Sequence, residues 1–243
     1  MFYISIIIFG FIIGIFLNVC ITRIPKGESV LNSTFYCKEC GLQLKLRDLI
    51  PVFNWLALKV KCKYCEADIS IQNTLVELLT AALFGLVYFS VGPSPEIFPT
   101  MFLVSLLIVV SFIDYRYFLI PNKVIIVGFV LGFLSHLVFP TITWQNIVLG
   151  FLAGGGVLWL LAILSKGGLG GGDIKLAALI GFYLGWRKVL IALFLGALTG
   201  SVVGLVLIIS KKITSKDPLP FGPFLSFGVF LNILFSRYFF LLK

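Results

Sequence analysis

Charge is scarce in this chain. Aspartate, glutamate, lysine and arginine make up 12% of the 243 residues, about half the share that water-soluble domains carry. Hydrophobic residues make up 60%, and the mean hydropathy is +1.11. This composition excludes a water-soluble globular protein. It predicts an all-α polytopic membrane protein, because helices satisfy their own backbone hydrogen bonds in lipid.

Histidine is rarer still, since His136 is the single one in the sequence. It falls near one end of an apolar segment, where packing between helices is the simpler role, and catalysis by a Ser-His-Asp or Cys-His arrangement is disfavoured. The glycine-rich segment 167–172 lacks the spacing of dinucleotide-binding and phosphate-binding loops. No basic stretch carries interleaved aromatic residues, so nucleic acid is not an expected partner.

A cleavable signal peptide is absent as well. Residues 1–22 have no basic start, their apolar run is too long, and no small-residue cleavage site follows it. We expect this segment to be the first of about eight transmembrane helices, because about 20 apolar residues cross a bilayer. The expected ranges are 2–22, 74–91, 99–115, 121–139, 145–164, 173–186, 188–210 and 222–241.

The basic residues indicate an orientation. Cytoplasmic loops of membrane proteins carry an excess of lysine and arginine. An N-terminus outside the cell places all but four of the 19 basic residues on the cytosolic side. The four exceptions are Arg187, Lys188, Arg237 and Lys243. The net charge of +9 is therefore interpreted as an orientation signal.

Four of the five cysteines lie in one charged segment, 23–73, which we expect to form a small cytosolic domain. Two C-x-x-C pairs at this separation can bind one structural Zn²⁺ through four thiolates. Two disulfides also fit the spacing, but a reducing compartment favours zinc. The fifth cysteine, Cys20, is expected to be a buried apolar residue. The proposed zinc ligands are Cys37, Cys40, Cys62 and Cys65.

The expected organisation is thus a first membrane helix over 1–22, a Cys₄ domain over 23–73 and a seven-helix membrane bundle over 74–243. Glycines recur at four-residue spacing in this bundle, a pattern that allows close helix packing in lipid. We assign no chemistry to these glycines, which are Gly150, Gly154, Gly196, Gly200 and Gly204.

Two aspartates mark the candidate catalytic site. Asp114 ends one predicted membrane helix and Asp173 begins another, and the expected topology places both at the cytosolic face. Ionisable groups at membrane depth are costly and usually functional. Two carboxyl groups that share a water molecule can hydrolyse a peptide bond, one as base and the other as acid. The pattern predicts an aspartic protease dyad of Asp114 and Asp173.

The glycines before Asp173 fit this chemistry. They permit positive φ angles and carry no side chains, so a substrate backbone could approach the carboxyl group closely. The predicted substrate contacts at this helix start are Gly170, Gly171, Gly172 and Lys175. Helix ends suggest different roles for the two acids, because a helix N-terminus favours negative charge. This predicts Asp173 as the resting base and Asp114 as the resting acid.

In these features the chain resembles the prepilin peptidases, or type IV leader peptidases, which are intramembrane aspartyl proteases with a G-x-G-D signature. The signature here is Gly170 to Asp173 in "GLGGGDIK", and the other family aspartate matches Asp114 in "IDYRYFLIPN". Further matching stretches cover nearly the whole chain. They are "GIFLNVCITRIP", both C-x-x-C pairs, "IPVFNWL", "CEADISIQNTLVELLTA" and "LPFGPFLSFG".

The resemblance implies an enzyme of the bacterial cytoplasmic (inner) membrane with its active site facing the cytosol. It implies removal of the basic leader from type IV prepilins or pseudopilins after a glycine. It also implies N-methylation of the new N-terminus, with S-adenosylmethionine as the methyl donor. Glu77 could bind a basic residue of the leader, or it could instead cap a helix or neutralise a nearby lysine or arginine.

Two other functions are compatible with parts of the sequence. A membrane scaffold of a pilus or secretion machine would explain the cysteines and the helices, but not the paired aspartates beside a glycine loop. A proton-coupled transporter would use paired carboxylates, yet it would place them near the middle of the membrane.

Overall fold

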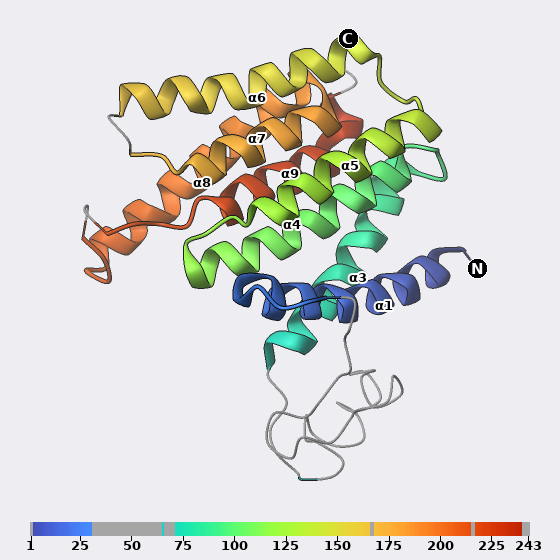
Figure 1. Ribbon diagram of the computed structural model, residues 1–243, viewed down its shortest axis with the longest axis horizontal. Coiled ribbons are helices and arrows are strands. Elements are labelled where there is room, and N and C mark those ends of the chain that lie inside the picture. The colour runs from blue at the N-terminus through green and yellow to red at the C-terminus, as the bar shows by residue number, and fades with distance from the viewer. Residues whose placement is uncertain (1, 31–64, 66–70, 166–167, 215–216, 240–243) are drawn as a thin grey trace. The chain divides into compact units, whose positions relative to one another are not determined.

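The computed structural model describes residues 2–30, 65, 71–165, 168–214 and 217–239 (Figure 1). These residues form eight α-helices and one 3₁₀ helix and contain no strand, which confirms the all-helical prediction. The elements are α1 (Phe2–Arg23), η1 (Ile24–Lys26), α3 (Ile71–Val91), α4 (Ile97–Tyr117), α5 (Asn122–Val138), α6 (Trp144–Leu164), α7 (Gly171–Leu184), α8 (Trp186–Ile209) and α9 (Gly222–Phe239).

Five of these helices are long and apolar enough to cross a membrane. They are α1, α3, α4, α6 and α8, each with at least 21 residues. Helices α5 and α9 are apolar but shorter, and α7 has only 14 residues. Since a full crossing takes about 20 residues, membrane insertion of the three shorter helices remains part of our prediction of about eight spans.

The chain divides into two compact units, residues 1–85 and 86–243. In the first unit, α1 and the beginning of α3 approach closely at glycines. A Cβ atom at Gly10 would lie 2.7 Å from the Cα of Ala81, and one at Gly14 would lie 2.7 Å from the Cα of Glu77. Only glycine permits this backbone contact. Helix α1 continues into η1 and stops at Gly27, whose φ of 75° ends the helical path.

In the second unit, α6 packs along α7, and α8 packs along α9 (Figure 1). Helix α4 contacts α5, α7 and α9. Along α7, the residues from Leu176 to Ile180 are all buried. A helix that is largely enclosed by other helices can be shorter than the bilayer is thick, because its neighbours shield its ends from lipid. This explains how a 14-residue helix can carry Asp173 inside the bundle.

The spaced glycines pack helices, as predicted. A Cβ atom at Gly150 would meet the carbonyl oxygen of Gly181, and one at Gly154 would meet that of Ala177. On α8, Gly196 lies against the backbone of Phe224 and Leu225. Gly200 contacts the Phe224 ring, and Gly204 faces Leu219.

His136 and Cys20, which we expected to be packing residues, are both buried. His136 is 2% exposed, contacts the rings of Phe182 and Tyr183, and its Nε2 lies 3.1 Å from the carbonyl oxygen of Phe182. Cys20 is 8% exposed on α1. Most of the predicted zinc domain, including Cys37, Cys40 and Cys62, lies outside the described residues, whereas Cys65 is described and exposed.

Candidate active site

Asp114 lies one turn before the end of α4. The helix stops because Phe118 adopts a left-handed conformation, with φ of 52°, and its N–H donates to the carbonyl oxygen of Asp114 at 2.8 Å. The Asp114 side chain is 5% exposed. Its Oδ2 accepts a hydrogen bond of 2.8 Å from the backbone N–H of Gly222, the first residue of α9. Two helices thus hold this carboxyl group.

Asp173 is the third residue of α7. The helix starts after Gly170, which has extended backbone angles, and the N–H of Asp173 donates to the carbonyl oxygen of Gly170 at 3.1 Å. An acidic side chain in the first turn complements the helix dipole. Asp173 is half-buried, and Gly170 and Gly171 beside it are exposed. This carboxyl group is therefore reachable from the glycine side.

The fold brings the two aspartates together. Helices α4, α7 and α9 contact one another in pairs, and the carboxyl groups are close enough for the charge of Asp114 to act on Asp173. Like charges at short range resist simultaneous ionisation, which favours a pair that shares one proton. A shared proton supplies one base and one acid to a single water molecule.

Helix ends do not give the two aspartates different roles in the structure. Since Asp114 also accepts a hydrogen bond at the N-terminal end of α9, both carboxyl groups lie at a helix N-terminus. Helix ends therefore no longer distinguish a resting base from a resting acid.

The glycines described in the segment before Asp173 do not use the positive φ angles that glycine permits. The described glycines with positive φ are Gly27, Gly92 and Gly185, all of which lie outside the segment 167–172. The lack of space for a side chain explains the glycines at positions 170 and 172. A Cβ atom at Gly172 would lie 2.9 Å from Cβ of Ile120, and one at Gly170 would lie 3.1 Å from Oδ2 of Asp173, whereas Gly171 faces open space.

Lys175 and Glu77 belong to different units of the chain and have different hydrogen-bond partners. The ammonium group of Lys175 donates to Oδ1 of Asn122 at 2.9 Å, which joins α7 to the first residue of α5. Glu77 belongs to the first unit, where it is 3% exposed on α3 and accepts a hydrogen bond from Asn18. Neither a cap nor a lysine or arginine partner for Glu77 occurs within the described ranges.

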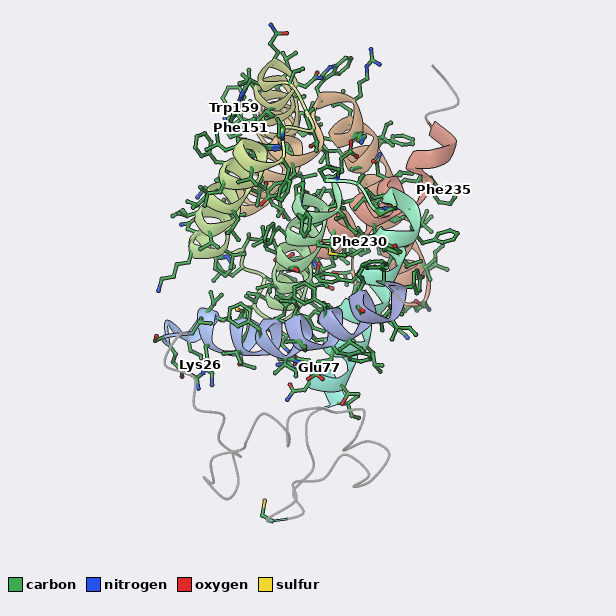
Figure 2. The ribbon with its side chains drawn as sticks, turned by 90° about the vertical axis from the view of Figure 1, so that its right-hand side faces the viewer. Lys26, Glu77, Phe151, Trp159, Phe230 and Phe235 are labelled. Atoms are coloured by element: carbon green, nitrogen blue, oxygen red, sulfur yellow. The ribbon has the colours of Figure 1, made fainter. Side chains whose placement is uncertain are left out.

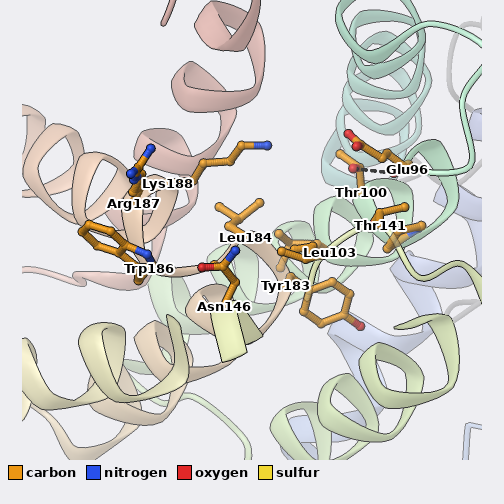
Figure 3. A pocket seen from close by; sticks show the side chains of 13 residues that line it. Glu96, Thr100, Leu103, Thr141, Asn146, Tyr183, Leu184, Trp186, Arg187 and Lys188 are labelled. Carbon is orange, nitrogen blue, oxygen red and sulfur yellow. Dashed lines mark hydrogen bonds between the residues drawn. The ribbon is translucent and has the colours of Figure 1, made fainter. Parts of the chain in front are cut away.

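A cavity of about 440 Å³ lies away from the aspartates (Figure 3). It is bounded by the N-terminal end of α4 and by the junction of α7 with α8. Asp114 and Asp173 lie at the opposite ends of α4 and α7, so this cavity is not the candidate active site. Its charged lining residues are Glu96, Arg187 and Lys188.

A second cavity, of about 380 Å³, lies next to the start of α7. Ile174 and Lys175, which directly follow Asp173, form part of its wall. We call it the apolar groove. Phe151 and Trp159 project from α6 on this side of the bundle (Figure 2). Its lining residues are Phe129, Phe151, Leu152, Gly155, Gly156, Trp159, Ile174, Lys175 and Ala178.

Two residues of the candidate sites were missed by sequence reasoning. The N–H of Gly222 donates to Asp114 across 108 positions of the chain. No local sequence pattern predicts such a contact. The glycine-proline pair that starts α9 marks only a helix beginning. Asn18 contacts Glu77 across 59 positions. A polar amide inside an otherwise apolar helix was the available signal for that residue.

Comparisons with known proteins cover both units. Residues 8–91 match the bacterial peptidase A24 N-terminal domain, and residues 101–205 match the type IV leader peptidase family. The chain is 38% identical over 231 residues to a prepilin leader peptidase/N-methyltransferase of Bacillus subtilis (strain 168), covering 94% of this chain and 92% of that protein.

Proteins with the same name in other bacteria are similar as well. The one from Aeromonas salmonicida is 31% identical over 259 residues, covering 94% of this chain and 89% of that protein. The one from Pseudomonas aeruginosa is 28% identical over 258 residues, with 95% and 89% covered. No solved structure matches the chain.

Proposed function

Because the chain belongs to the type IV leader peptidase family, we propose that it is a membrane aspartic endopeptidase that removes prepilin leaders. The observation that carries this function is the pair of carboxyl groups of Asp114 and Asp173, brought within electrostatic range of each other. A scaffold has no need of such a carboxyl pair. A transporter would place its carboxylates along a path through the membrane, whereas these two lie at the ends of their helices.

The dyad would hydrolyse the peptide bond with a water molecule held between the two acids. One carboxylate takes a proton from the water while the oxygen attacks the scissile carbonyl carbon. The protonated partner hydrogen-bonds to the carbonyl oxygen and supplies the proton needed as the bond breaks. The Gly222 N–H fixes one carboxyl group through Oδ2. Exposed Gly170 and Gly171 leave room for the extended substrate backbone beside the other.

The apolar groove would receive the membrane helix of the substrate. A prepilin combines a charged leader with an apolar helix, so its cleavage site lies at the membrane surface. The groove begins at Ile174 and Lys175, directly after Asp173. Gly155 and Gly156 in its wall permit close approach of another helix. An apolar segment held there would present the adjoining leader junction to the dyad.

We further propose that the protein methylates the new N-terminus, a proposal supported by the word N-methyltransferase in the names of its relatives. S-adenosylmethionine would supply the methyl group. The substrate would be a prepilin or a pseudopilin cleaved after a glycine, in agreement with the family resemblance. None of the described residues is assigned to binding of the methyl donor.

The cysteine pairs support a zinc site that faces the cytosol. Four thiolates suit a closed, structural Zn²⁺ site, with Cys37, Cys40, Cys62 and Cys65 as ligands. We propose the orientation with the N-terminus outside. In inverted vesicles, a membrane-impermeant maleimide is expected to label these thiols only after a chelator removes zinc. Labelling in right-side-out vesicles would contradict the orientation, and equal labelling without the chelator would contradict the zinc site.

The experiment for the proposed function is mass spectrometry of a synthetic prepilin incubated with the purified protein and S-adenosylmethionine. We expect the substrate to lose the mass of its leader and the product to gain one methyl group on its new N-terminus. A folded protein that leaves the prepilin intact would contradict the protease and favour the scaffold. Cleavage without methylation would remove only the second activity.

A further inference from the structure

Asn18 of α1 and Glu77 of α3 form a buried polar pair in the first unit. Their side chains are 7% and 3% exposed. The amide nitrogen of Asn18 donates to the carbonyl oxygen of Asn73 at 2.9 Å and to Oε1 of Glu77 at 3.3 Å. Both amide hydrogens are thereby used. This arrangement determines which way the amide faces, because its carbonyl oxygen must take the other direction.

Two oxygen atoms of the pair are left over. Among the described residues, Oδ1 of Asn18 and Oε2 of Glu77 are buried and have no hydrogen-bond partner. An unpaired buried acceptor is unfavourable and calls for an explanation. Both atoms accept hydrogen bonds, and one belongs to an acidic side chain. A ligand for the pair must therefore donate at least two hydrogen bonds, and a positive charge would suit it best.

The helix contact that supports this pair is rigid. Gly14 lies against the backbone of Glu77, where a Cβ atom would come within 2.7 Å of Cα. The position of the carboxyl group is thus set by close backbone packing of α1 on α3. The hydrogen bond between the two side chains, at 3.3 Å, is longer than usual for an amide and a carboxylate. A ligand could displace this bond at little cost.

We infer that Asn18 and Glu77 bind a primary ammonium group, the N-terminal amine that leader removal creates on the pilin. An ammonium group has three donors, which two free acceptors can nearly satisfy, whereas a planar guanidinium brings five. A lysine side chain of the leader offers the same chemistry. The new amine is the better match, because N-methylation requires that this nitrogen be held in one place.

The location along the helices agrees with this ligand. Asn18 lies near the C-terminal end of α1, and Glu77 lies in the second turn of α3. The proposed topology assigns both of these helix ends to the cytosolic side, where the leader is removed. The inference rests on the proposed function, and it deepens that function by naming residues that would position the substrate for its second step.

The test compares binding of two pilin peptides to the full-length protein in detergent. Both peptides have the mature N-terminal sequence, and one is N-acetylated. We expect the free amine to bind about tenfold tighter or more, as a charge-assisted hydrogen bond would provide. Glu77→Gln should reduce the ratio of the two affinities to near one. Thr80→Val is the matched control, because Thr80 is equally buried one turn further along α3 and bonds only to its own helix.

Three outcomes would overturn the inference. They are equal binding of both peptides by the native protein, an unchanged affinity ratio in Glu77→Gln, and a lost ratio in Thr80→Val. A leader peptide whose lysines bind in a Glu77-dependent manner, without an amine preference in the pilin peptides, would assign the pair to the leader instead. If Glu77→Gln does not fold, Asn18→Ala provides the same comparison.

Leader cleavage by each variant separates this inference from the proposed function. We expect Thr80→Val to cleave and methylate as the native protein does, and Glu77→Gln to methylate a peptide that already has the mature N-terminus more slowly. A native protein that cleaves no prepilin would contradict the proposed protease, whereas a native protein that cleaves prepilin but shows no amine preference would contradict only the positioning site.

Discussion

Replacement of either Asp114 or Asp173 by asparagine is expected to slow leader removal by about 10³-fold or more, because the dyad needs both a base and an acid. Asparagine keeps the size of the side chain and can neither take up nor release the proton. The two variants should lose similar amounts of activity, and the double variant should lose little more, since the two groups act as a unit. Initial rates on a synthetic prepilin, followed by mass spectrometry, measure the effect.

Asp217→Asn provides the matched control for these variants. Asp217 lies exposed in the segment between α8 and α9, and its carboxylate accepts hydrogen bonds from the backbone N–H and hydroxyl of Thr214. The backbone hydrogen bond from Thr214, followed by that from the hydroxyl, lowers the pKa of Asp217. The same substitution there is expected to leave cleavage unchanged. Full activity in Asp114→Asn or Asp173→Asn would remove the dyad from the mechanism.

The helix positions could be predicted because a helix that crosses lipid needs a run of about 20 mostly apolar residues. Every expected range overlaps an observed helix, and the boundaries differ by only a few residues. The apolar run and the break at "IPK" are enough to end α1 near Arg23. The start of α7 was predicted within two residues, at 173 instead of Gly171, because a run of glycines disfavours a helix.

The contacts that shape the two sites could not be predicted in the same way. The hydrogen bond from Gly222 to Asp114 and that from Asn18 to Glu77 join segments far apart in sequence. Such contacts depend on which helix faces meet. The hydrophobic periodicity of the sequence does not reveal these faces, because nearly every face of each helix is apolar. The same limit applies to the packing contacts of the glycines before Asp173. Gly172 is needed for the contact with Ile120, and not for an unusual backbone conformation.

Replacement of Gly181 or Gly150 by alanine is expected to lower the free energy of unfolding by about 2 kcal/mol or more, as overpacking of a tight core does. Each glycine meets the backbone of the other helix. A Cβ atom at Gly181 would meet the carbonyl oxygen of Gly150, and one at Gly150 would also lie 2.8 Å from Cα of Gly185. Backbone atoms cannot rotate away as a side chain can, so α6 and α7 must separate.

Gly156→Ala on the same helix distinguishes this contact from an effect of glycine itself. A Cβ atom there would meet nothing within 4 Å, and alanine favours a helix over glycine by up to about 1 kcal/mol. We therefore expect Gly156→Ala to leave the free energy of unfolding unchanged or to raise it slightly, whereas the Gly181 and Gly150 variants lower it. Thermal unfolding in detergent measures both. Because α7 carries Asp173, the Gly181 and Gly150 variants should also lose leader peptidase activity. Equal stability of all three variants would mean that α6 and α7 do not cross at these glycines.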